Sequence, residues 1–287
     1  MRLASVVALF VLFGWLSEKA ASQISIGPDK LPSAGDVFIA HPMDTTSVFE
    51  GTAGANKSWN FAGLTSSAIP ETIQYVNAST TPFAQQFPNA SLASVINDGG
   101  FVTYAYFSTA SNKLTLYGSA GEEFMIQYDD PEIQMSTPLN FNDQYSDQFS
   151  GAMTGEGFIV RTGGSLNVIN DSYGTLVLPG GASMPAARVK FVRQNFDTTF
   201  VNGIPLMTSS LTITSYEWFI ASAKFPVLQI AYYVQVTNGS TTRIKKVDYN
   251  PFAPTSVDER KKDGVATTFK LDQNFPNPFN PATTIGF

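Results

Sequence analysis

Apolar and polar residues alternate along much of the chain, with the period of two that is typical of β-strands. The alternation is clearest within residues 186–249, where Ala187, Val189 and Phe191 alternate with Arg188 and Lys190. Asn-Gly pairs at positions 202–203 and 238–239 separate extended segments, and such pairs favour tight hairpins because both residues tolerate positive φ. The pattern predicts four antiparallel strands in a meander over this stretch.

Earlier segments fit the same scheme. Further strands are predicted at residues 101–107, 113–117, 123–128, 157–161, 165–169 and 174–178, with a hairpin at 118–121. A helical turn near residues 82–93 is the one weak exception to the β pattern. About twelve strands favour an all-β fold, either an antiparallel β-sandwich or an open barrel.

Composition agrees with a packed extracellular β protein. Hydrophobic residues make up 43% of the chain and aromatic residues 13%, whereas charged residues make up only 14%. The net charge is −6 and the one dense basic run, residues 260–262, lies beside two acids, so a nucleic-acid partner is excluded. Cysteine is absent, which excludes disulfides, thiol nucleophiles and cysteine-based metal centres, and we expect no cofactor.

The N-terminus has the pattern of a signal peptide. Arg2 precedes an apolar stretch at residues 3–16, and small residues lead to a predicted cleavage between Ser22 and Gln23. The apolar stretch is too short to span a bilayer, and no later segment is long and apolar enough to do so. We therefore expect export through the Sec translocon and no integral membrane segment in the mature protein.

The C-terminus carries an unusual asparagine- and proline-rich string. It consists of Gln273, Asn274, Phe275, Pro276, Asn277, Pro278, Phe279, Asn280 and Pro281. The string resembles the opening of the type A sorting domain of type IX secretion substrates. That family's sorting domain normally continues for several more strands, so residues 269–287 are expected to hold only its start. The resemblance implies an extended lead-in, a first strand from residue 282, and transport by the type IX machinery to the outside or the outer cell surface.

These observations divide the chain into four parts. We expect a signal peptide at residues 1–22, a β-rich secreted domain at 23–250, a linker at 251–268 and the incomplete sorting segment at 269–287. Within the central domain, residues 54–61, 173–179 and 216–218 are similar to short sequence segments of uncharacterised secreted proteins that have the same C-terminal segment. This similarity supports export and implies no particular activity.

Candidate catalytic residues are few. His41 is the single histidine, it precedes a proline, and the chain has no Gly-x-Ser-x-Gly nucleophile elbow, so a structural or exposed role is favoured over catalysis. A histidine-based metal site would need more than one histidine.

Acidic residues gather around the predicted hairpin at 118–121 and after it. They are Glu122, Glu123, Asp129, Asp130, Glu132, Asp143 and Asp147. Three interpretations are open: a solvated surface, which is the most ordinary, a calcium site built from oxygen ligands, or a carboxylate pair that hydrolyses glycosides.

Aromatic residues offer two further alternatives. Trp59, Tyr216, Trp218, Tyr232 and Tyr233 could form a stacking platform for sugars or, more commonly in β proteins, part of the core. Because no catalytic set stands out, the leading hypothesis is a non-enzymatic secreted or surface-attached protein that contacts surface glycans or other adhesion partners. The alternative is a secreted polysaccharide-degrading hydrolase that uses paired carboxylates.

Overall fold

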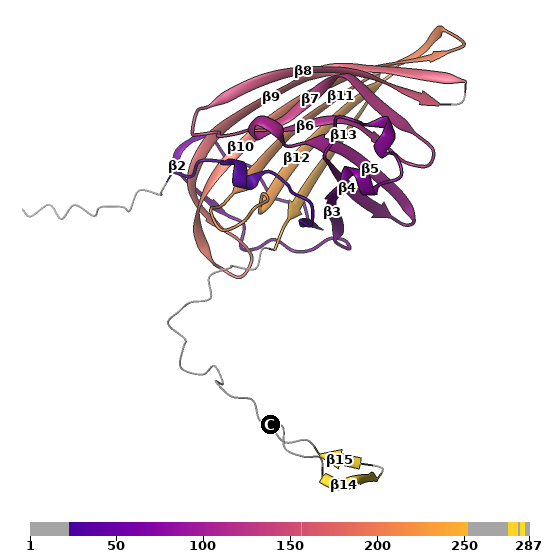
Figure 1. Ribbon diagram of the computed structural model, residues 1–287. Helices are drawn as coiled ribbons and strands as arrows, with labels where there is room; N and C mark the ends of the chain where they lie inside the picture. Colours follow the sequence, from indigo (N-terminus) through magenta and orange to yellow (C-terminus); the bar gives the residue numbers. More distant parts are fainter. Residues whose placement is uncertain (1–22, 156, 252–274, 281, 285–287) are drawn as a thin grey trace, which may run out of the picture. The chain divides into compact units, whose positions relative to one another are not determined.

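The computed structural model describes residues 23–155, 157–251, 275–280 and 282–284 (Figure 1). The predicted signal peptide and nearly all of the predicted linker lie outside these residues. The chain divides into two units, residues 1–252 and 253–287, which are described separately.

The first unit is built on one sheet of thirteen strands among the described residues (Figure 1). The strands are β1 (Val37–Pro42), β2 (Gly54–Asn60), β3 (Glu71–Asn77), β4 (Leu92–Asp98), β5 (Phe101–Ser108), β6 (Lys113–Ala120), β7 (Met125–Ser136), β8 (Gln144–Gly155), β9 (Phe158–Val177), β10 (Ser183–Val201), β11 (Ile204–Phe219), β12 (Leu228–Thr237) and β13 (Ser240–Tyr249). Short 3-10 turns occur at η1 (Pro28–Lys30), η2 (Ala78–Thr80), η3 (Ala84–Gln86) and η4 (Ala110–Asn112).

Twelve of these strands form an antiparallel barrel. Each strand from β3 to β13 pairs with the next along the chain, and β1 pairs with both β13 and β3. The sheet therefore closes on itself. The prediction of an all-β antiparallel fold of about twelve strands is confirmed. Of the two architectures considered the barrel is the one that forms, but it is closed by the β1–β13 pairing and not open.

The thirteenth strand, β2, lies outside this ring. It pairs in parallel with residues 172–177 of β9, whereas β8 pairs with residues 158–169 of the same strand. A Cβ added to Gly174 would lie 1.9 Å from the carbonyl oxygen of Lys57, so glycine is required for this close approach. β2 thus covers the part of β9 that β8 leaves unpaired.

Both predicted Asn-Gly hairpins are present. Asn202 and Gly203 have φ values of 49° and 77°, and Asn238 and Gly239 have values of 48° and 81°. Positive φ at both central residues is the geometry that type I′ turns need. The four-strand meander predicted for residues 186–249 corresponds to β10–β13.

The prediction of three short strands between residues 157 and 178 is wrong, because β9 runs through them without a break for 20 residues. The Gly163–Gly164 pair suggests a turn in the sequence, but here it admits neighbours. A Cβ on Gly164 would lie 1.9 Å from the carbonyl oxygen of Gln194 and 2.9 Å from the ring of Phe149. Glycine in this strand therefore makes room for packing.

Two local predictions also need correction. The hairpin expected at residues 118–121 turns later, at 121–124, and Gly118 instead sits in β6 where the pairing with β7 shifts register. The expected helical turn at 82–93 is reduced to the three residues of η3. Gly118 has a φ of 147°, and a Cβ added to it would lie 2.0 Å from the carbonyl oxygen of Ile126. This glycine is therefore part of a β-bulge and not of a turn.

The inner and outer faces of the barrel carry different clusters. Outside β10–β13, the segment after β1 packs Met43, Val48, Trp59 and Phe61 against a buried cluster that includes Trp218. On the inner face, apolar residues of β9 and β10, among them Leu166 and Val189, form a second buried cluster with Ile26 of the N-terminal segment. The outer layer therefore shields the outer face of the strands from solvent, whereas the inner face lines a cavity.

The N-terminal segment seals one end of the barrel. Ile26 forms a backbone bridge with Leu139, and Lys30 donates hydrogen bonds to the carbonyl oxygens of Ala221 and Ala223 at 2.9 and 2.6 Å. Lys224 in turn reaches Asp36 at 2.5 Å. These contacts fasten η1 to the loop between β11 and β12.

The second unit contains an antiparallel pair, β14 (Phe275–Asn280) and β15 (Ala282–Thr284). The strand predicted from residue 282 corresponds to β15, and the expected extended lead-in forms β14. Of the predicted sorting motif, Gln273, Asn274 and Pro281 lie outside the described residues.

Candidate functional site in the barrel interior

The barrel contains a partly open cavity of about 390 Å³. Its lining residues come from β1, β3, β6, β7 and β9–β12, which are distributed around the ring of strands. The cavity therefore lies within the barrel. Its lining is mainly apolar, and the main apolar side chains are Leu31, Phe38, Ile73, Tyr75, Leu114, Phe191, Ile213, Phe219 and Phe225. A mainly apolar cavity of this volume with a few polar groups is typical of a small-molecule site.

Glu217 on β11 is the most perturbed acid in the cavity wall. Its Oε1 accepts a hydrogen bond of 2.7 Å from Gln229 Nε2 on β12, and the Ser215 hydroxyl also bonds it. Its side chain is half-buried and lines the cavity. Burial raises the pKa of Glu217 to about 7, although both hydrogen bonds act to lower it. The carboxyl group is therefore largely protonated below neutral pH.

A second polar pair joins β7 to β10. Arg193 Nε donates to Glu132 Oε1 at 2.8 Å, and Arg193 Nη2 donates to the Tyr128 hydroxyl at 3.3 Å. Both residues line the cavity, and because the Glu132 side chain is 1% exposed and that of Arg193 is 22% exposed, the cation has the larger open surface. Arg193 also lies over the ring of Phe149, 4.3 Å from its centre.

The sealed end adds one more charge to the cavity wall. Besides its two carbonyl partners, Lys30 Nζ lies 3.3 Å from Asp29 Oδ2. Nearby, Tyr75 stacks on Phe225 with ring centres 5.5 Å apart. Burial, with a smaller contribution from Glu217, raises the pKa of Tyr75 to about 12, so it stays a neutral hydroxyl.

The aromatic residues considered as a sugar platform lie elsewhere. Trp59 and Trp218 are buried on the outer face, with ring centres 5.9 Å apart, and Tyr216 and Tyr232 pack beside them. Tyr233 points to the opposite face of β12, as the alternation predicts. The core interpretation is therefore confirmed for the two tryptophans.

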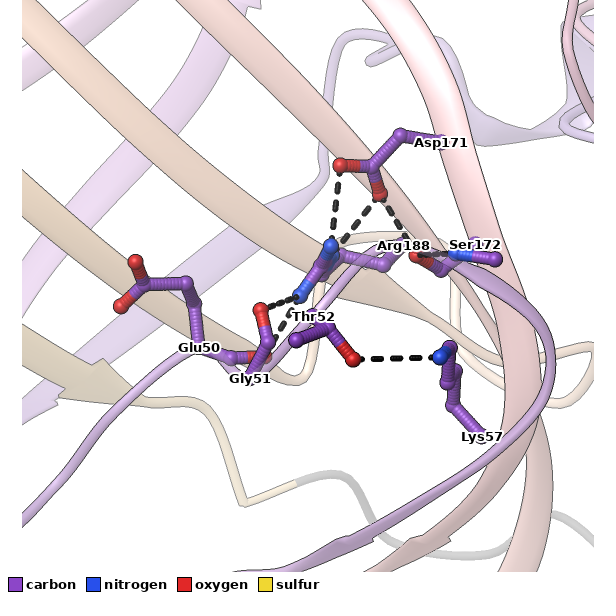
Figure 2. A network of polar contacts seen from close by, with 8 residues as sticks. Glu50, Gly51, Thr52, Lys57, Asp171, Ser172 and Arg188 are labelled. Atoms are coloured by element: carbon purple, nitrogen blue, oxygen red, sulfur yellow. Dashed lines mark hydrogen bonds and ion pairs between the residues drawn. The ribbon is translucent and has the colours of Figure 1, made fainter.

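A buried arginine fills the space among these rings. Arg188 is 1% exposed, and its guanidinium carbon lies 5.0 to 5.9 Å from the ring centres of Tyr216, Trp59 and Trp218. Figure 2 shows Arg188 between Asp171 and the loop segment at Glu50 and Gly51. The protein's own cation therefore occupies the aromatic surface that a sugar would need.

The contacts of Arg188 explain how the segment that leads into β2 is held to the barrel (Figure 2). Its Nε and Nη2 donate to the two carboxylate oxygens of Asp171 at 2.8 and 2.9 Å, and Nη1 donates to the carbonyl oxygens of Glu50 and Gly51. Asp171 sits where the β9–β10 register shifts, so the bulge turns its side chain toward Arg188. The network is a structural clamp.

The predicted acidic cluster is dispersed. Glu122, Glu123, Asp129 and Asp130 are exposed. Asp143 accepts hydrogen bonds from Asn140 within a turn. Asp147 accepts from the backbone N–H of Ile133, and Glu132 alone reaches the cavity. Within the part of the chain that the structure describes, no group of three or more histidine, cysteine or acidic residues could hold a metal ion. The solvated-surface interpretation fits the exposed members best.

His41 lies on β1 beside Tyr249 of β13, at the barrel wall and not among the residues that line the cavity. Among the described residues, no helix has the length and apolar character needed to cross a membrane.

Comparison with known proteins gives no relatives. No protein-family model, curated protein or solved structure matches the chain.

Sequence reasoning missed the polar groups of the cavity other than Glu132. Glu217 follows Tyr216 and precedes Trp218, which puts it on the opposite face of the strand from both. That signal was available, since an acid among aromatic neighbours on a predicted strand must face either solvent or a polar interior. Arg193 likewise continues the inward series of Ala187, Val189 and Phe191.

Proposed function

We propose that this chain is an exported, non-enzymatic binding protein whose barrel interior holds a small ligand. The observation that carries the proposal is the internal cavity, which combines apolar walls with the polar groups of Glu217, Gln229 and Arg193. Its volume corresponds to roughly a dozen water molecules. This is adequate for a small molecule.

Export is the second part of the proposal. The signal-peptide pattern before Gln23 and the string at residues 273–281 support passage through the Sec translocon and then the type IX machinery, to the outside or the outer surface. Contact with surface glycans belongs to the same proposal, on the outside of the molecule. Mass spectrometry of secreted protein tests the first step, and we expect Gln23 at the mature N-terminus. Secreted material that keeps residues 1–22 would contradict it.

A hydrolase with paired carboxylates is the second candidate. One observation favours it, because Glu132 and Glu217 line the same cavity and burial raises the pKa of Glu217. A reducing-sugar assay on soluble polysaccharides tests it. Turnover that disappears in Glu217→Gln and Glu132→Gln would replace the binding proposal with this one.

The binding proposal is tested by filling the cavity. An environment-sensitive apolar dye is titrated into the wild type, into Ile213→Trp and into Ile159→Trp. Ile213 lines the cavity, whereas Ile159 is 42% exposed, so the same enlargement serves as a matched control. We expect Ile213→Trp to weaken dye binding by about tenfold or more and Ile159→Trp to leave it unchanged. Equal binding by all three proteins, each with an unchanged far-ultraviolet spectrum, would refute an internal site.

A further inference from the structure

We propose that the cavity selects an uncharged, mainly apolar molecule with a single hydrogen-bonding group. This inference rests on the proposed function, because it specifies the ligand of the same cavity. It follows from how the charges of the cavity wall are already matched within the protein.

The charges of the first pair are matched without a ligand, although only one oxygen of the Glu132 carboxylate is hydrogen-bonded and Oε2 is buried with no partner among the described residues. The guanidinium of Arg193 holds Glu132 at 2.8 Å, and the carboxylate of Glu132 lies almost fully behind it at 1% exposed. An anionic ligand would have to share Arg193 with this fixed carboxylate. A cationic ligand could approach the pair only from the side of Arg193. Each therefore meets a like charge.

The second charge at the wall is also satisfied. Lys30 Nζ is held by the carbonyl oxygens of Ala221 and Ala223 and by Asp29. Lys30 lines the cavity, but its side chain is only 5% exposed and its ammonium group is already held by these partners. It offers little to an anion.

The remaining acid of the cavity is hydrogen-bonded and not paired with a cation. Glu217 is bonded by Gln229 and Ser215, and these three residues lie side by side on β11 and β12. Burial favours its neutral form, which can donate as well as accept. Other titratable groups near it are the hydroxyls of Tyr75, Tyr145 and Tyr233, and burial raises the pKa of each, so that all three stay neutral.

These facts set the ligand's chemistry. A buried ligand charge would lack an available counter-charge and would lose its hydration, which is costly in an apolar cavity. A hydroxyl or carbonyl, in contrast, can bond Gln229, Glu217 or the exposed part of Arg193. The apolar body would pack on side chains such as Phe38, Phe191 and Phe225.

The test compares three probes with the same hydrocarbon chain: decanol, decanoate and decylamine. Each displaces the apolar dye from the mature protein at a pH below the pKa of Glu217. We expect decanol to bind about tenfold or more tightly than either charged probe. Decanoate or decylamine binding as tightly as decanol would overturn the inference while leaving the binding site intact. If none of the three displaces the dye and Ile213→Trp has no effect on the dye, the proposed function itself fails.

A variant adds an independent measurement. Glu132→Gln removes the carboxylate that occupies Arg193 and keeps the side-chain shape, so it should raise decanoate affinity by about tenfold while decanol affinity stays the same. Glu123→Gln, at an exposed position, is the matched control. Unchanged decanoate affinity in a folded Glu132→Gln protein would show that the ion pair does not set the charge selection.

Discussion

The substitution Glu217→Gln should change how the stability of the barrel depends on pH. In the folded protein burial raises the pKa of Glu217 to about 7, whereas the ordinary value is 4.5. Between these two values the unfolded chain has already ionised this group while the folded protein keeps its proton. Wild-type stability therefore falls as pH rises through this window, and the loss is complete above the folded pKa. A pKa difference of about 2.5 corresponds to about 3 kcal/mol.

The assay is urea unfolding of the wild type, Glu217→Gln and Glu123→Gln at about pH 4 and about pH 8. Glutamine keeps a hydrogen-bonding group next to Gln229 and cannot ionise. The wild type should therefore lose about 3 kcal/mol more than Glu217→Gln between the two pH values. Glu123→Gln, which alters an exposed acid, should behave as the wild type does. Parallel pH profiles for the wild type and Glu217→Gln would refute the assignment of this acid to a poorly hydrated interior.

Three other perturbations test the fold. Arg188→Met leaves the Asp171 carboxylate, which is 10% exposed, without its cation. Urea unfolding should therefore show that the free energy of unfolding falls by about 3–5 kcal/mol. Arg243→Met, at an exposed position, should have little effect. Gly239→Ala places a side chain at φ 81° and should cost about 1–2 kcal/mol, and the same change at Gly63, where φ is not positive and space is open, should cost nothing. Deleting residues 253–287 should shift the Tm of the barrel by less than about 2 °C, because its ladder of strands closes without them; a larger loss would contradict this.

The strands from β10 to β13 could be predicted from the sequence because their information is local. Alternation fixes the two faces, and the Asn-Gly pairs at 202–203 and 238–239 fix the turns. β9 could not be predicted as one strand, because its glycines suggest breaks and their reason lies in partners distant in sequence. Gly164 approaches the backbone of β10, and Gly174 approaches the backbone of β2. Local composition cannot distinguish a glycine that turns the chain from one that admits a neighbour.

The site was harder to predict than the strands, for a related reason. Alternation separates Glu217 from Tyr216 and Trp218, yet it does not say which face the barrel encloses. The outer face proved just as well buried, because β2 and the segment before it cover it. The acidic residues clustered in sequence were divided between faces by the pleat, and Glu132 found its partner Arg193 61 positions away. Such pairings depend on closure of the whole sheet.

The closure of the barrel between β1 and β13 has a consequence for the order in which the protein can fold. The two strands stand at opposite ends of the domain's sequence, and Lys245 of β13 donates to the carbonyl oxygen of Thr45, 200 positions earlier. Contacts of such long range form slowly, because a large loop must be ordered before they are gained. While residues 240–249 are still unavailable, β1 lacks one of its two partners and the growing sheet keeps two open edges. A chain that emerges N-terminus first, from a ribosome or a membrane channel, can therefore assemble its hairpins one by one, but it can complete the ring only when its last strand arrives.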